Sequence, residues 1–88
     1  MDISELKAHV SHKIQTAFPT AHVRISQLSE DPGDLGVSVF NVAKDQVRAA
    51  KDLILDLDEE LCLKQNWALI PMVRDVETTV RFYPQFAK

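Results

Sequence analysis

Residues 21–42 limit what this chain can fold into more than any other feature, because they alternate like the two strands of a β-hairpin. In the segment 21–28 apolar residues stand at alternate positions 21, 23 and 25, and in the segment 35–42 they stand at positions 35, 37 and 39. Between these segments, Pro32 fixes φ and Gly33 allows a positive φ, as a turn requires. A sheet with one face on a core produces such alternation, so the segment predicts an antiparallel hairpin.

The two faces of this hairpin differ in character. The residues expected to face the core are Val23, Ile25, Val37 and Val39. Leu28 and Phe40 fall on the opposite face, which a two-layer domain leaves open. Exposed apolar patches usually mark contacts, so Leu28 and Phe40 are candidate interface residues, together with alternate residues of a third strand.

A helix is predicted over residues 3–17, before the hairpin. Asp2 can accept a hydrogen bond from the backbone N–H of Glu5, and the Glu5 side chain can reach back, which is the pattern of a capping box. Its apolar stripe consists of Ile3, Leu6, Val10, Ile14 and Ala17. Pro19 ends the pattern, because a residue before proline avoids the α region.

A second helix is expected after the hairpin, from near Lys44 and Asp45 to residues 63–65. Its apolar stripe, widened by Leu53, consists of Ala43, Val47, Ala50, Ile54, Leu57 and Leu61. The Asp45 carboxylate suits the positive end of the helix dipole. About five turns are enough to cross a small sheet.

Residues 67–73 are almost continuously apolar and predict a third strand. Such a strand is buried on both faces or has one face against a partner, which makes Trp67 a further candidate interface residue. Pro71 has no N–H to donate to a ladder, so the strand is expected at the sheet edge or bulged at this position.

The last segment has two interpretations. Residues 76–83 fit a short helix capped by Asp75, with Val76, Thr79 or Val80, and Tyr83 on one face. Alternatively, residues 78–83 form a fourth strand, since Thr, Val, Phe and Tyr favour strands. The helix is the favoured interpretation, and the strand stays open.

These elements predict one α+β domain over residues 1–88, a two-layer sandwich in which both helices pack on one face of a small sheet. The order is α-β-β-α-β, followed by the short C-terminal helix or a fourth strand. The crossover from the second strand to the third is expected to be right-handed. Such a topology by itself implies no function.

Charge and composition narrow the class of partner. The net charge is −3 and the ten basic residues are scattered, whereas proteins that bind nucleic acid usually carry a basic stripe. The two glycines, Gly33 and Gly36, exclude a glycine-rich phosphate loop. Cys62 has no cysteine to pair with, and no signal peptide or membrane-spanning run is recognisable, so a cytoplasmic location is expected.

The first helix offers one candidate metal site. Glu5, His9 and His12 fall on its solvent side at spacings of four and three residues. Two imidazoles and a carboxylate are a ligand set that metal ions accept, although a solvated polar face explains the same residues. A metal- or ligand-responsive regulatory domain is therefore the alternative function.

No nucleophile–base pair or carboxylate dyad stands out in the sequence, so no enzyme and no cofactor are expected. The leading expectation is a small non-catalytic interaction or regulatory module whose partner is a protein. It is expected to self-associate as a homodimer through the outer sheet face or the strand that contains Pro71. Nucleic-acid binding ranks last.

Overall fold

The fold is built around β2, the central strand of a three-stranded sheet with the order β1-β2-β3. The computed structural model describes residues 2–28 and 33–87. Its helices and strands are α1 (Ile3–Ala17), β1 (His22–Gln27), β2 (Asp34–Val42), α2 (Val47–Gln65), β3 (Ala68–Asp75) and α3 (Val76–Phe82). Two short 3-10 turns, η1 (Lys44–Gln46) and η2 (Pro84–Phe86), precede α2 and follow α3.

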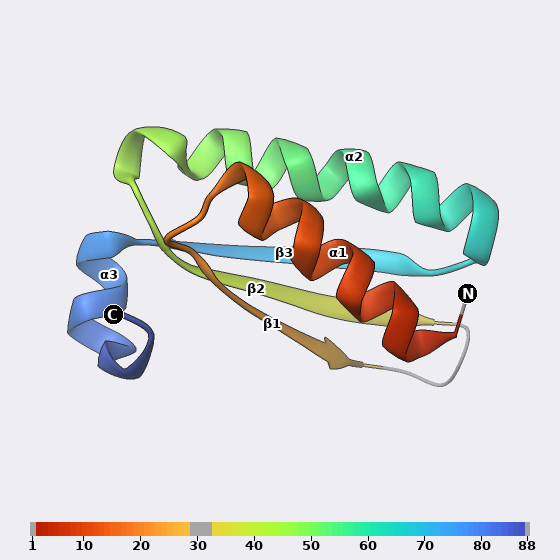
Figure 1. Ribbon diagram of the computed structural model, residues 1–88, viewed down its shortest axis with the longest axis horizontal. Helices are drawn as coiled ribbons and strands as arrows, with labels where there is room; N and C mark the ends of the chain where they lie inside the picture. Colours follow the sequence, from red (N-terminus) through yellow and green to blue (C-terminus); the bar gives the residue numbers. More distant parts are fainter. Residues whose placement is uncertain (1, 29–32, 88) are drawn as a thin grey trace.

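The architecture is the predicted α+β arrangement of helices packed against a small sheet. In Figure 1, α1 and α2 lie on one side of the strands, and α3 lies on the other side at one end of the sheet. The buried side chains between these layers come chiefly from α1, α2, β2 and β3, and β1 adds half-buried ones. Those that are wholly inaccessible to solvent include Leu6, Val10, Ile14, Leu35, Val37, Val39 and Ile54.

The hairpin prediction is confirmed. β1 and β2 pair antiparallel from His22 opposite Phe40 to Gln27 opposite Leu35. Val37 and Val39 are buried in the core, and Val23 and Ile25 pack against it half-buried. The predicted turn at Pro32 lies outside the described residues.

The helix boundaries follow from local chemistry. The Asp2 carboxylate accepts a 2.8 Å hydrogen bond from the N–H of Glu5, which confirms the predicted cap of α1. α2 begins at Val47, slightly later than predicted, because residues 44–46 form the tighter turn η1. α2 ends at Gln65, where Asn66 adopts a left-handed conformation with φ 59° and its N–H bonds to the Leu61 carbonyl.

β3 runs parallel to β2 and lies at the edge of the sheet, as Pro71 predicted. The register is regular through Pro71, from Asp34 opposite Ala68 to Val39 opposite Val73, so the alternative of a bulge at Pro71 is wrong. The irregularity lies in β2 between Val39 and Val42, and Asn41 there has a φ of 65°.

The C-terminal segment is a helix and not a fourth strand. The Asp75 carboxylate accepts a 2.7 Å hydrogen bond from the N–H of Thr78, which caps the first turn of α3. The N–H of Tyr83 bonds to the Thr79 carbonyl at 2.8 Å and closes the last turn. In an extended strand the N–H of Thr78 would lie too far from the Asp75 carboxylate to donate this hydrogen bond.

Candidate interaction surface

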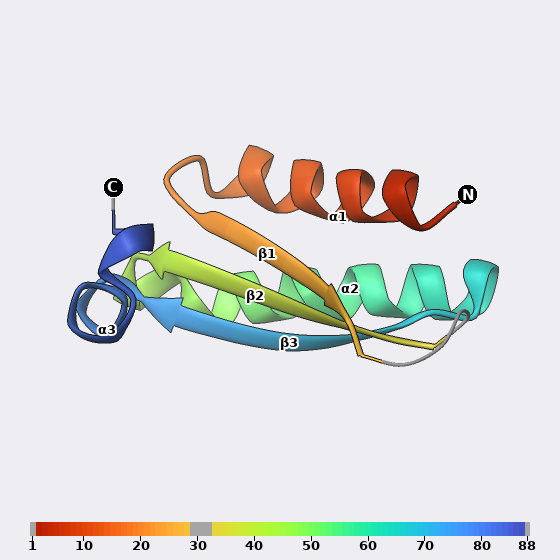
Figure 2. The same ribbon diagram turned by 90° about the horizontal axis from the view of Figure 1, so that it is seen from below.

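The sheet face turned away from α1 and α2, here called the outer face, carries every second residue of the strands. It consists of His22, Arg24, Ser26 and Leu28 on the β1 side, Asp34, Gly36, Ser38 and Phe40 on β2, and Ala68, Ile70, Met72 and Arg74 on β3. Figure 2 looks onto this face, with the strands in front of α2 and α3 at one end. Helices therefore cover the opposite face and leave most of this one open.

Exposed apolar side chains lie at the centre of the outer face and at its Ala68 end. Leu28, Ile70 and Met72 are 57%, 47% and 37% exposed, respectively. Leu28 lies across Gly36, since a Cβ atom added to this glycine would be 3.4 Å from Leu28 Cδ1. Ile70 is the register partner of Gly36 on the other side. The small residues of the central strand thus leave the apolar side chains of both edges accessible.

Phe40 lies on the outer face, but the expectation that it is exposed is corrected, because only 4% of it is accessible. The ring of Phe86 stacks on it with centroids 4.5 Å apart, and the ring of Tyr83 lies at 4.9 Å. The Arg24 guanidinium stands 5.7 Å from the Phe86 ring, and His22 lies beside the same ring. The C-terminal segment of its own chain therefore covers Phe40.

Trp67 is not on the surface either. It lies between α2 and β3, is buried, and belongs to the main hydrophobic core. β3 begins at Ala68, one residue later than predicted, and Trp67 lies two residues before the buried Leu69, on the same inward side. The exposed residues of this strand are Ile70 and Met72. Strand alternation identifies them, because Leu69 and Val73 at the other positions point inward.

The free edge of β3 is partly closed to further strand pairing. The N–H of Ala68 points to β2 and bonds to the Gly33 carbonyl at 3.0 Å, so the N–H of Leu69 points to the free edge. There the Asp58 carboxylate of α2 accepts it at 2.7 Å. The next residue that faces the edge is Pro71, which has no N–H. Two consecutive positions on this edge therefore offer no free donor.

α3 is joined to the sheet by buried polar contacts and leaves apolar side chains outside. Thr79 is wholly buried, and its hydroxyl contacts the backbone of Asn41 in β2. Val76, Val80 and Phe82 are exposed on the same helix. α3 thus presents exposed apolar side chains of its own.

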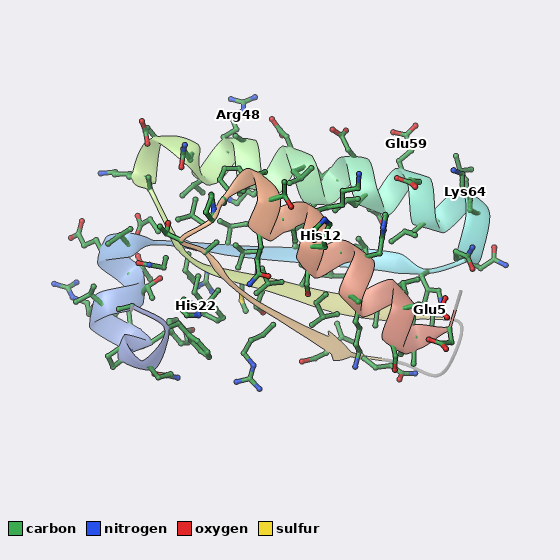
Figure 3. All side chains as sticks on the ribbon, in the orientation of Figure 1. Glu5, His12, His22, Arg48, Glu59 and Lys64 are labelled. Carbon is green, nitrogen blue, oxygen red and sulfur yellow. The ribbon has the colours of Figure 1, made fainter. Side chains whose placement is uncertain are left out.

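The candidate metal ligands do not converge. Figure 3 shows Glu5 near the start of α1 and His12 about two turns further along. Seven residues of helix correspond to about 10 Å, whereas the ligands of one ion lie within roughly 2 Å of it. Across residues 2–28 and 33–87, no group of three His, Cys, Asp or Glu side chains is placed to hold a metal ion.

The outward side of α2 is charged, in contrast to the outer face of the sheet. Figure 3 shows Arg48, Glu59 and Lys64 on this side. Lys64 and Glu60 form an exposed ion pair at 3.9 Å. Leu63 is 80% exposed but lies among these charges, and single surface apolar residues are common.

No protein-family model matches this chain, and no curated protein or solved structure is significantly similar to it. Among the helices of the described residues, none combines the length and apolarity needed to cross a bilayer. The part of the chain that the structure describes contains no pocket.

Proposed function

We propose that this protein is a small non-catalytic interaction module that self-associates as a homodimer through the outer face of its sheet. The observation that carries the proposal is the gathering of exposed Leu28, Ile70 and Met72 on one open face. Contiguous exposed apolar patches mark contact surfaces, whereas scattered apolar residues do not. A second copy presents the same apolar surface and is the simplest complementary partner.

The face, and not the edge of β3, is the favoured contact. An added strand needs a row of free backbone donors and acceptors. Asp58 occupies the N–H of Leu69, and Pro71 has none. Side-chain packing on the outer face meets no such obstacle.

The size of the outer face favours weak association. In the view of Figure 2 the whole molecule has Cα extents of 34 by 16 Å, and the outer face occupies only part of this outline. Stable dimers usually bury roughly 800 Å² on each partner, so this contact lies at the low end of specific interfaces. We therefore expect dissociation in the micromolar range.

The test is sedimentation equilibrium of the wild-type protein and two matched variants. Ile70→Lys places a charge in the centre of the outer face, and an edge strand tolerates lysine. Leu63→Lys makes the same kind of change on the outward side of α2. Circular dichroism checks that both variants stay folded.

We expect wild type and Leu63→Lys to associate reversibly and Ile70→Lys to stay monomeric. A wild-type protein that is monomeric at several hundred micromolar contradicts the proposal. Equal association of the two variants also contradicts it, because the outer face would then not be the contact.

A further inference from the structure

One end of the outer face is raised by the C-terminal segment of the chain. Phe86 of η2 stacks on Phe40, so the C-terminal segment stands on this face at the end of β2. Thr79 joins α3 to Asn41 at the same end. In Figures 1 and 2, α3 projects beyond the sheet on that side, while no helix of residues 2–28 and 33–87 lies on this face at the opposite end.

α3 and η2 together form a ridge on the outer face, and this ridge limits how two outer faces can meet. If the strands of both copies ran in the same direction, the two α3 helices would be opposed and would hold the apolar centres apart. If the strands run in opposite directions, each α3 lies beside the Leu28 end of the other copy. Ile70 and Met72 of both copies can then meet at the centre.

The charges on the face favour the same arrangement. Arg24 and Arg74 lie toward the α3 end, and Asp34 lies at the opposite end. Parallel packing places like charges against each other, whereas antiparallel packing brings Asp34 of each copy toward the arginines of the other. Only the sign of the Asp34 charge matters here, whatever contacts it makes in its own chain. Opposed like charges disfavour an interface and complementary charges fix its register.

We propose that two copies pack outer face to outer face with their strands antiparallel, so that the α3–η2 end of each meets the Ala68 end of the other. This inference rests on the proposed self-association and adds the orientation of the partner. The ridge formed by α3 and η2 determines that orientation, and the charge pattern reinforces it.

The experiment is cysteine cross-linking in a Cys62→Ser background, which removes the native exposed thiol. Gln85→Cys marks the ridge over Phe40, and Ala68→Cys marks the opposite end of the face. Leu63→Cys on α2 measures random collision. Each variant by itself, and each pairwise mixture of variants, is treated with a short bismaleimide. Sedimentation is measured on the same samples.

We expect the mixture of Gln85→Cys and Ala68→Cys to cross-link severalfold more than either variant alone or any combination with Leu63→Cys. In the antiparallel arrangement, two identical cysteines lie at opposite ends of the interface. Six residues of strand separate these ends, so the two cysteines are about 20 Å apart, too far for a short bismaleimide.

Dominant cross-linking of Gln85→Cys with itself overturns the orientation but leaves self-association intact. A dimer by sedimentation whose mixed cross-link does not exceed the Leu63→Cys background also overturns the orientation. If every sample sediments as a monomer and all cross-linking stays at background, the proposed self-association itself is contradicted.

Discussion

The backbone N–H of Asn41 in β2 donates a 2.8 Å hydrogen bond to the side-chain oxygen of Thr79 in α3, 38 residues away. The Thr79 hydroxyl in turn donates to the Asp75 carbonyl at 2.7 Å. Asn41 lies in the irregular stretch of β2, where the strand register shifts and its φ is 65°. The hydroxyl thus gives the Asn41 N–H a partner outside the strand ladder and joins α3 to the sheet.

Replacement of Thr79 with valine preserves shape and removes this hydroxyl. Because Thr79 is wholly buried, the Asn41 N–H loses its partner without gaining water. We expect the free energy of unfolding to fall by about 1–3 kcal/mol. Urea unfolding followed by Trp67 fluorescence measures the change. Thr79→Ser retains the hydroxyl and is expected to cost less; a serine variant less stable than the valine variant would show that packing dominates here.

Asp75 gives the stability a dependence on acid pH. The pKa of its carboxyl lies below the ordinary 3.8, chiefly because the backbone N–H of Thr78 donates to it and next because of the Thr78 hydroxyl. Desolvation of the carboxyl opposes this lowering of the pKa, and the charge of Lys44 adds to the lowering. A folded-state pKa below the unfolded one means that the stabilisation is complete above the unfolded pKa and is lost as the pH falls through the folded pKa.

We therefore expect the wild-type protein to lose more stability than Asp75→Asn between neutral pH and a pH of about 2. Asparagine accepts the same hydrogen bond but does not titrate in this range. Thermal unfolding of both proteins across the series measures the difference, which cancels the other carboxylates. Parallel pH profiles of the two proteins would remove Asp75 as a source of acid sensitivity.

Asp58 stabilises the edge of the sheet. Its carboxylate accepts the N–H of Leu69 at 2.7 Å and links α2 to β3. We expect Asp58→Ala to lower the free energy of unfolding by about 1–2 kcal/mol, since a hydrogen bond to a charged acceptor is lost from a half-buried site. Asp52→Ala, an exposed position on the same helix, is the control and is expected to change stability little. Equal effects of the two substitutions would rule out a specific role for the Leu69 contact.

Gly36 is a position where stability can be gained. Its φ is not positive, and an added Cβ would meet Leu28 only at ordinary contact distance, 3.4 Å from Cδ1. We expect Gly36→Ala to stabilise the protein by about 0.5–1 kcal/mol, because alanine loses less backbone freedom on folding. Chemical denaturation measures this change. A loss of stability would mean that Leu28 cannot shift away from the new methyl group.

Much of the architecture could be predicted because it depends on neighbours in the sequence. The caps at Asp2 and Asp75 each need a carboxylate and an N–H three residues apart. The hairpin follows from alternation, and the edge position of β3 follows from Pro71. Each of these signals is a property of a few adjacent residues, which periodicity and side-chain chemistry reveal.

The sequence by itself determined which segments are helices or strands and which of their faces are apolar, apart from the last helix. The tertiary structure decided which apolar residues remain outside. Phe40 is covered because Tyr83 and Phe86 return to it, Trp67 packs into the core under α2, and Ile70 and Met72 stay exposed. The physical reason is that burial depends on contacts between residues far apart in the chain, and no local pattern contains their positions.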